Sequence, residues 1–261
     1  MTSENQKHVE HPLAPLSKAV VVGASSGIGE AIARKLAKEG YVVALLARRT
    51  DRLVKIAEEI NGLAGEPRAF FYEHDVTDFE QVKPLFQTVL KAFQSIDLLV
   101  YNSGMMNSSG ISEFDAAKDH EMIDVSLKGA ISWLSEAAVL FEQMGKGQIV
   151  GISSVAGDRG RVANPGYNTS KAGFSTYLEA LRNRLSRKGV HVLTVKPGYV
   201  DTDLLPANLG PFPAAAPEKI AYDIWRAVKR RKQVIYTPWW WRYILLIVEH
   251  IPSFIFRRMS F

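Results

Sequence analysis

The 261-residue sequence contains no cysteine, so disulfide bonds, thiolate nucleophiles and cysteine-ligated metal sites are excluded. No apolar run approaches the roughly 20 residues that a membrane-spanning helix requires. Residues 1–16 lack the apolar core of a signal peptide, and we expect a flexible lead there. Its histidines, His8 and His11, have no ordered surroundings to orient them as ligands, so we expect no metal site.

Basic motifs with interleaved aromatic residues are also missing, which argues against a nucleic-acid partner. The formal net charge is only +5, and much of the basic excess lies after residue 225, where it suits a phosphate or a membrane surface. With 47% hydrophobic and 23% charged residues, the composition is that of a globular protein. We expect a cytoplasmic location, with the membrane surface as an alternative.

From residue 17 onward, short apolar runs alternate with helical segments. This alternation predicts a single α/β domain over residues 17–238, in which a doubly wound parallel sheet of about seven strands carries helices on both faces. A long helix is expected over residues 115–143. The predicted strands are 19–23, 41–47, 69–73, 96–101, 148–153, 190–196 and 233–237.

A glycine-rich loop follows the first predicted strand and opens a helix. Such a loop turns sharply and brings backbone N–H groups against a diphosphate, which side chains at the glycines would block. Its spacing, G-x3-G-x-G, differs from the usual G-x-G-x-x-G. The loop residues that we expect to hold a dinucleotide are Gly23, Ser25, Ser26, Gly27, Ile28 and Gly29.

Arg48 and Arg49 directly follow the second predicted strand. In a dinucleotide-binding domain, the residues at this strand end select between NAD and NADP. An acidic residue there would bind the ribose 2′-hydroxyl of NAD, whereas two guanidinium groups suit the 2′-phosphate of NADP(H). The alternative is that both arginines begin an exposed, charged helix.

Other strand ends carry small or polar residues that face the same expected cleft. Asp75 is a candidate contact for an adenine amino group, and Thr202 for the nicotinamide end. The segment 203–217 shows no clear helical or strand periodicity of apolar residues, and it is interpreted as a substrate lid. The cofactor-binding candidates at these strand ends are Asp75, Val76, Asn102, Ser103, Gly104, Pro197, Gly198, Val200 and Thr202.

The fifth predicted strand leads into Ser154, Tyr167 and Lys171. On a helix, residues four apart share a face, so the Lys171 ammonium is expected beneath the Tyr167 phenol, lowering its pKa toward neutrality. A hydroxyl at Ser154 would hydrogen-bond the carbonyl oxygen that the tyrosine protonates. A tyrosine and a lysine at this spacing occur by chance in many helices, so the surrounding motifs decide the interpretation.

These motifs, in this order over residues 17–238, resemble the short-chain dehydrogenase/reductase family. The resemblance implies a Rossmann fold and a nicotinamide cofactor. It also implies that Tyr167 is the general acid and base, that Ser154 polarises the carbonyl, and that Lys171 holds the nicotinamide ribose. Ser126 stands where the family usually has a proton-relay asparagine, so we expect a less efficient relay.

A narrower resemblance concerns family members that reduce a decaprenylphosphoryl 2-keto-pentose. It rests on the string AGDRGR at 156–161 and on the pattern of basic, proline and aromatic residues in the tail. Arg159 and Arg161 would then suit a phosphate-bearing substrate. The alternative is that they form a loop salt bridge or an oligomer contact.

The tail, residues 239–261, is rich in tryptophan, aliphatic and basic residues. Tryptophan and tyrosine favour the lipid headgroup boundary, and arginine favours anionic lipid, so one interpretation is a helix lying on a membrane surface. The other is a tail packed over the substrate pocket or across a dimer interface.

The leading hypothesis is an NADPH-dependent oxidoreductase of a small-molecule or lipid-like carbonyl compound. A nucleotide-sugar epimerase or dehydratase would use the same tyrosine and lysine but usually has a larger substrate domain. A regulator that binds NADP without chemistry is the alternative from another class. The family resemblance implies a homodimer or homotetramer.

Overall fold

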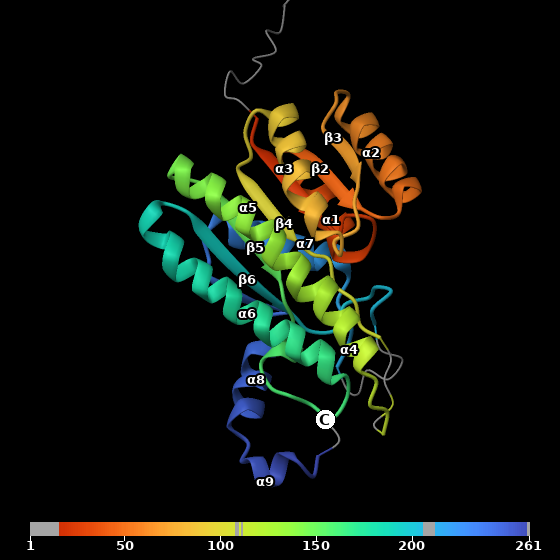
Figure 1. Ribbon diagram of the computed structural model, residues 1–261, viewed down its shortest axis with the longest axis vertical. Coiled ribbons are helices and arrows are strands. Elements are labelled where there is room, and N and C mark those ends of the chain that lie inside the picture. Colours follow the sequence, from red (N-terminus) through yellow and green to blue (C-terminus); the bar gives the residue numbers. More distant parts are fainter. Residues whose placement is uncertain (1–15, 108–109, 111, 206–211, 260–261) are drawn as a thin grey trace, which may run out of the picture.

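The computed structural model describes residues 16–107, 110, 112–205 and 212–259. Its centre is a parallel sheet in the order β3-β2-β1-β4-β5-β6-β7 (Figure 1). Each strand is a short, largely apolar run, and the bounds of all seven lie within two residues of the predicted bounds. The strands are β1 (Lys18–Val22), β2 (Val42–Ala47), β3 (Ala69–Glu73), β4 (Leu98–Tyr101), β5 (Gln148–Ile152), β6 (His191–Pro197) and β7 (Val234–Thr237).

Helices cover both faces of the sheet, as predicted for a doubly wound fold. Alternate β1 residues face opposite layers: Val21 packs into the core under α1, α2 and α7, and Val20 into the core under α3, α5 and α6. Burial on both sides explains why the strand is uninterrupted in apolar residues. The main helices are α1 (Gly27–Lys38), α2 (Thr50–Ala64), α3 (Phe79–Phe93), α4 (Ala116–Ile123), α5 (Gly129–Met144), α6 (Pro165–Leu185) and α7 (Pro217–Lys229).

The chain order reverses beside β1, whose two neighbours are β2 and β4. In open α/β sheets, ligands bind outside the carboxyl ends of the strands at such a point. The glycine loop after β1 and the Asn102 segment after β4 therefore meet at this edge.

The predicted helix over 115–143 is interrupted. Residues Asp124–Lys128 form a π-helical turn between α4 and α5, in which the Gly129 N–H donates to the Asp124 carbonyl. The Val125 carbonyl accepts a hydrogen bond from the Tyr101 hydroxyl at 2.6 Å. Single π-turns inside α-helices are frequent at functional sites.

The tail folds into α8 (Trp241–His250) and α9 (Ser253–Phe256), which Figure 1 shows beyond the start of α6. Trp241 is buried against the loop after β6, where a Cβ on Gly198 would overlap its indole. Within the described residues, no helix is long and apolar enough to cross a membrane. The predicted lead over 1–16 and the middle of the predicted lid, 206–211, lie outside the described residues, apart from Leu16.

Candidate active site

The glycine loop is shaped by close contacts that leave no room for side chains. Gly23 has φ +84°, and a Cβ there would lie 2.7 Å from the Ser103 nitrogen. A Cβ on Gly29 would overlap the Gly23 carbonyl, and the Asn102 amide donates to that carbonyl at 3.0 Å. Ile28 packs on the core below. The loop is therefore a rigid cradle of backbone at the start of α1, which suits a diphosphate.

Arg49 lies against the serines of this loop. Its guanidinium donates to the Ser25 hydroxyl at 3.0 Å and to the Ser26 hydroxyl at 2.6 Å. Arg48 is more exposed and pairs with Asp75 at 3.6 Å. The two guanidinium groups and the serine hydroxyls thus lie together beside the cradle, where Asp203 also pairs with Arg49 at 3.6 Å.

Asp75 lies just beyond the carboxyl end of β3. Burial acts to raise its pKa, but hydrogen bonds from the backbone and hydroxyl of Thr77, together with the Arg48 charge, outweigh burial and hold the pKa below its ordinary value. Asp75 is therefore ionised near neutrality and able to accept a hydrogen bond. The neighbouring Val76 is buried under the start of α5.

Ser154 and Tyr167 meet at the end of β5. Ser154 caps a short 3-10 helix, and its hydroxyl accepts the Ala156 N–H at 3.0 Å. The Tyr167 phenol, in the first turn of α6, is hydrogen-bonded to Ser154. Two hydroxyl groups therefore converge on one point, from which both can donate to a single substrate oxygen.

Lys171 lies one turn further along α6 and is buried. Its Nζ donates to the Ile152 carbonyl at 3.0 Å, and burial lowers its pKa to about 8. A Cβ on Gly104 would lie 3.1 Å from this Nζ and 3.7 Å from the Ser126 Oγ, so the three residues surround one small space. The π-turn carries Ser126 into this space, where its hydroxyl also accepts the Met105 N–H at 3.3 Å.

The structure corrects the expected pKa of Tyr167. Burial raises it above the ordinary value, although the Ser154 hydrogen bond and the Arg161 charge act in the opposite direction. Burial thus outweighs the lowering that was expected from Lys171, whose Nζ lies 5.7 Å from the Tyr167 ring centroid and donates to the Ile152 carbonyl. Sequence spacing placed the two groups on one face but could not show this competing acceptor.

The segment after β6 closes the cleft from the other side. Pro197 ends the strand, and Val200 is buried, pairing with Ala215. The Thr202 side chain lies so close to Gly27 that a Cβ on the glycine would be 2.9 Å from it. This segment therefore bridges the catalytic residues and the glycine cradle.

The two arginines after Ser154 have different surroundings. Arg161 donates to the Val155 carbonyl at 3.2 Å and lies near enough to Tyr167 to influence its pKa. Arg159 instead donates to the Val248 and Glu249 carbonyls and lies 3.8 Å from the Phe256 ring centroid. Arg161 thus stands beside the reacting groups, whereas Arg159 contacts the tail, a contact that neither interpretation of the sequence included.

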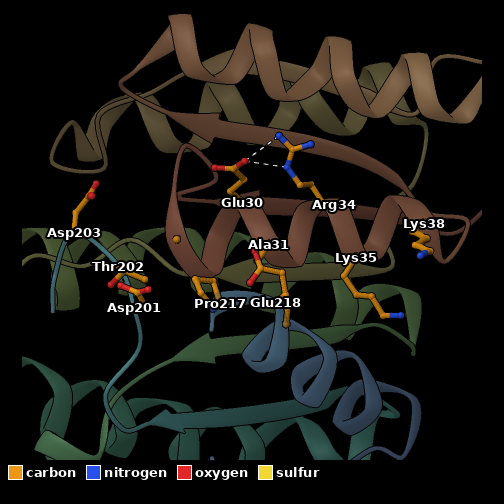
Figure 2. Close-up of a pocket in the computed structure, with 12 residues that line it drawn as sticks. Glu30, Ala31, Arg34, Lys35, Lys38, Asp201, Thr202, Asp203, Pro217 and Glu218 are labelled. Carbon is orange, nitrogen blue, oxygen red and sulfur yellow. Dashed lines mark hydrogen bonds and ion pairs between the residues drawn. The ribbon is translucent and has the colours of Figure 1, made fainter. Parts of the chain in front are cut away.

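Figure 2 shows a hollow between α1 and α7 on the outer side of the cradle. It shares Gly27 and Thr202 with the cleft but includes none of Ser154, Tyr167 and Lys171. Charged residues of both signs line it, among them the ion pair of Glu30 and Arg34. The hollow is therefore not the reaction centre.

A buried ion-pair cluster escaped the sequence analysis. Asp158, in the loop after Ser154, pairs with Lys196 of β6 and accepts the Tyr236 hydroxyl at 2.9 Å. It ties the catalytic loop to the last two strands. Only the charged Lys196 within an apolar strand offered a signal in the sequence. Among the described residues, no cluster of three metal-ligating side chains occurs.

The order of these strand-end motifs in a doubly wound sheet matches a known family. A family model described as short chain dehydrogenase covers residues 17–209. The chain belongs to this family. The prediction of a short-chain dehydrogenase/reductase with a Rossmann fold is therefore confirmed.

Relatives in this family include an uncharacterized oxidoreductase of Staphylococcus epidermidis, 35% identical over 186 residues, which span 71% of this chain and 79% of that protein. An uncharacterized oxidoreductase of Mycobacterium tuberculosis is 28% identical over 245 residues, which span 93% of this chain and 97% of its own. Because 93% of the chain is matched, the unmatched part is shorter than the tail, residues 239–261. The second match therefore extends into the tail.

Solved structures share the fold. An alcohol dehydrogenase from the archaeon Thermococcus sibiricus, complexed with 5-hydroxy-NADP, has a TM-score of 0.76 and 29% identity, and covers 84% of this chain and 95% of its own. An actinorhodin polyketide ketoreductase with NADPH has a TM-score of 0.77 and 24% identity, and covers 85% of this chain and 95% of its own.

Proposed function

We propose that this chain is an NADPH-dependent oxidoreductase that interconverts a carbonyl group and an alcohol in a lipophilic substrate. The observation that carries the proposal is the convergence of Ser154 and Tyr167 at the carboxyl end of β5, with buried Lys171 beside them. The same edge of the sheet carries the glycine cradle. The catalytic hydroxyl groups and a dinucleotide bound at the cradle would thus lie next to each other at the carboxyl edge of the sheet.

The residues present fit a nicotinamide dinucleotide phosphate. The cradle of Gly23 and Gly29 would hold the diphosphate, since a Cβ at either glycine would close it. Arg48 and the Arg49–Ser25 contact would hold the 2′-phosphate, because guanidinium groups match phosphate oxygens. Relatives by structure carry such cofactors in their complexes, which supports the assignment.

In the direction of reduction, the bound cofactor supplies a hydride to the carbonyl carbon. Ser154 and Tyr167 orient the carbonyl by donating hydrogen bonds to its oxygen, and Tyr167 transfers its proton there as negative charge develops. Lys171 and Ser126 lie behind the tyrosine, where a proton can be returned to it. Because burial raises the pKa of Tyr167, the phenol is protonated near neutrality, as an acid must be.

The surroundings of the reacting hydroxyl groups support a lipophilic substrate. Val155 follows Ser154 directly and packs with Trp241 of the tail. Tyr199 stands edge-on to Trp241, with ring centroids 5.4 Å apart. These side chains form an apolar cluster between the catalytic loop and the tail.

A second candidate is the reduction of a polyprenyl-phosphate keto-sugar. Arg161 favours it, because a buried guanidinium beside Tyr167 can pair with a phosphate group. Such a substrate would also carry the long apolar chain that the Val155 and Trp241 contacts suit. This reaction uses the same Ser154 and Tyr167 chemistry.

The proposed function is tested by following NADPH absorbance with a panel of ketones, aldehydes and lipid extracts. We expect NADPH oxidation that depends on the carbonyl compound and that is strongest with long-chain substrates. Tight NADPH binding with no oxidation by any member of the panel would instead favour a non-catalytic regulator.

Replacement of Arg48 or Arg49 is expected to change cofactor preference. Arg48→Ala and Arg49→Ala should each weaken NADPH binding by about tenfold, because each removes a charge-assisted hydrogen bond to the 2′-phosphate. NADH binding should change little in both variants, as measured by fluorescence titration.

Arg52→Ala is the matched control, since Arg52 is an arginine of the same helix start whose ion pair is with Asp203, at 3.8 Å, and which is not assigned to the 2′-phosphate. An NADPH-to-NADH affinity ratio that is the same in wild type and in an Arg48→Ala/Arg49→Ala double variant would refute the 2′-phosphate assignment.

A further inference from the structure

The tail helix α8 has two different apolar faces. Its inner face is buried against the catalytic loop, with Trp241 and Leu245 each 1% exposed. Its outer face is open: Leu246 is 55% and Ile247 68% exposed. Burial against the protein explains why the inner face is apolar. It does not explain why the exposed outer face is also apolar.

The outer face continues across the helix ends into α9. A shallow groove at the end of α8 is lined by Leu246, Ile247, His250, Ile251 and Pro252. Large apolar and aromatic side chains are exposed along the tail on both sides of these residues in the sequence. We call these residues the tail face: Trp239, Tyr243, Leu246, Ile247, Phe254, Ile255 and Met259.

Basic side chains accompany the tail face. Arg242 of α8 is exposed, as are Arg257 and Arg258 directly after α9, whereas Glu249 is the single acidic residue of the sequence between 239 and 261. Arginine beside exposed tryptophan and tyrosine is the composition of segments that lie at the headgroup boundary of an anionic bilayer.

The tail face is held in place before any partner binds. Arg159 donates to the last carbonyls of α8, at Val248 and Glu249, and its guanidinium lies over the Phe256 ring of α9. Trp241 fills the space above Gly198. Docking therefore need not order the helices first, which removes an entropic cost of binding.

We propose that the tail face docks on an anionic lipid surface, with α8 and α9 lying in the plane of the headgroups. The charge and residue types of the tail face favour a lipid surface over other partners. Aromatic side chains with one polar end suit the lipid headgroup boundary, and the arginines complement lipid phosphate. A second copy of the chain would bring the like charges of Arg257 and Arg258 toward those of its partner.

Docking in this way has a consequence for the cleft. Val155 packs on the inner face of α8 and directly follows Ser154, so docking would hold the catalytic serine near the lipid surface. This consequence rests on the proposed function, whereas docking itself does not. A lipid substrate would then reach Tyr167 without crossing water.

Co-sedimentation with vesicles tests the docking. We expect the full chain to sediment with vesicles of phosphatidylglycerol and phosphatidylcholine, and much less with phosphatidylcholine alone. Arg257→Gln/Arg258→Gln should lower the partition coefficient on anionic vesicles about 25-fold, since each arginine contributes about fivefold. Leu246→Ser/Ile247→Ser should lower it by about tenfold or more on both.

The matched control is Leu63→Ser/Val139→Ser, which removes two exposed apolar side chains, 87% and 57% exposed, from other helices. It should sediment as wild type does. NADPH binding, measured on every variant, distinguishes a variant that no longer docks from one that no longer folds. Sedimentation requires no turnover, so the docking test remains valid even if the proposed reductase activity is absent.

Fluorescence gives an independent reading. Trp239 is 70% exposed on the tail face, whereas Trp133 and Trp241 are buried. Lipids brominated near the headgroup should quench part of the emission, and Trp239→Phe should abolish that quenching. Wild-type protein that neither sediments nor is quenched would overturn the proposal. The proposal would also be overturned if Leu246→Ser/Ile247→Ser turned a dimer into a monomer without changing sedimentation. The tail face would then join two copies of the chain.

Discussion

Tyr167→Phe is expected to lower kcat for carbonyl reduction by about 10³-fold. The variant keeps the ring but removes the phenolic hydroxyl that is hydrogen-bonded to Ser154 and that would donate the proton. Stopped-flow measurement of NADPH oxidation gives the rate. In the reverse direction, wild-type alcohol oxidation should accelerate as pH rises, because burial raises the pKa of Tyr167 and the phenol must lose its proton to act as a base.

The control for Tyr167→Phe is NADPH affinity, which should change little because the ring and the glycine cradle are intact. Ser154→Ala is the companion variant, with a smaller expected loss of about 10²-fold, since it removes a hydrogen bond to the oxygen but no proton transfer. A Tyr167→Phe variant that kept more than about a tenth of wild-type kcat would show that another group protonates the substrate.

Gly29→Ala is expected to abolish measurable cofactor binding. The added Cβ would overlap the Gly23 carbonyl and lie 2.6 Å from the Asn102 amide nitrogen, so the cradle must open. Moving Gly23 also breaks the hydrogen bond from Asn102. Isothermal titration with NADPH, together with thermal unfolding, measures the loss of binding and of stability.

Gly62→Ala is the matched control, because Gly62 lies inside α2 and an added Cβ there would meet nothing within 4 Å. Alanine is the better helix former by about 1 kcal/mol, so this variant should be slightly more stable and bind NADPH normally. Equal NADPH affinity in the Gly29→Ala and Gly62→Ala variants would disprove the role of the cradle.

The local sequence shows where the central strands end, because β1, β4 and β5 are buried on both faces. The run at 19–22 must be apolar throughout, so the small and polar residues that follow it stand out. Parallel strands end at one edge, and motifs far apart in the chain are thereby brought together. This is why the glycine loop, Asn102, Ser154 and Tyr167 were predictable as one site, and the fold itself was confirmed.

The π-turn at Ser126 was not predictable. Apolar periodicity continues through residues 122–134, which indicates one helix. Within the interruption, the Val125 carbonyl accepts a hydrogen bond from the Tyr101 hydroxyl, which comes from a strand 24 residues earlier in the chain. The pKa of Tyr167 likewise depends on burial and on the acceptor that holds Lys171, and neither is written in the spacing of the two residues.

The sequence by itself determined the family, the doubly wound sheet and the residue types that gather at its carboxyl edge, because these follow from local periodicity and from motifs at strand ends. Only the tertiary structure decided that Arg159 contacts α8 and α9 while Arg161 stands beside Tyr167. It also decided that Trp241 packs inward on Gly198 while Ile247 faces outward. Composition shows that a tail is apolar, but which side is covered depends on contacts between segments distant in the chain.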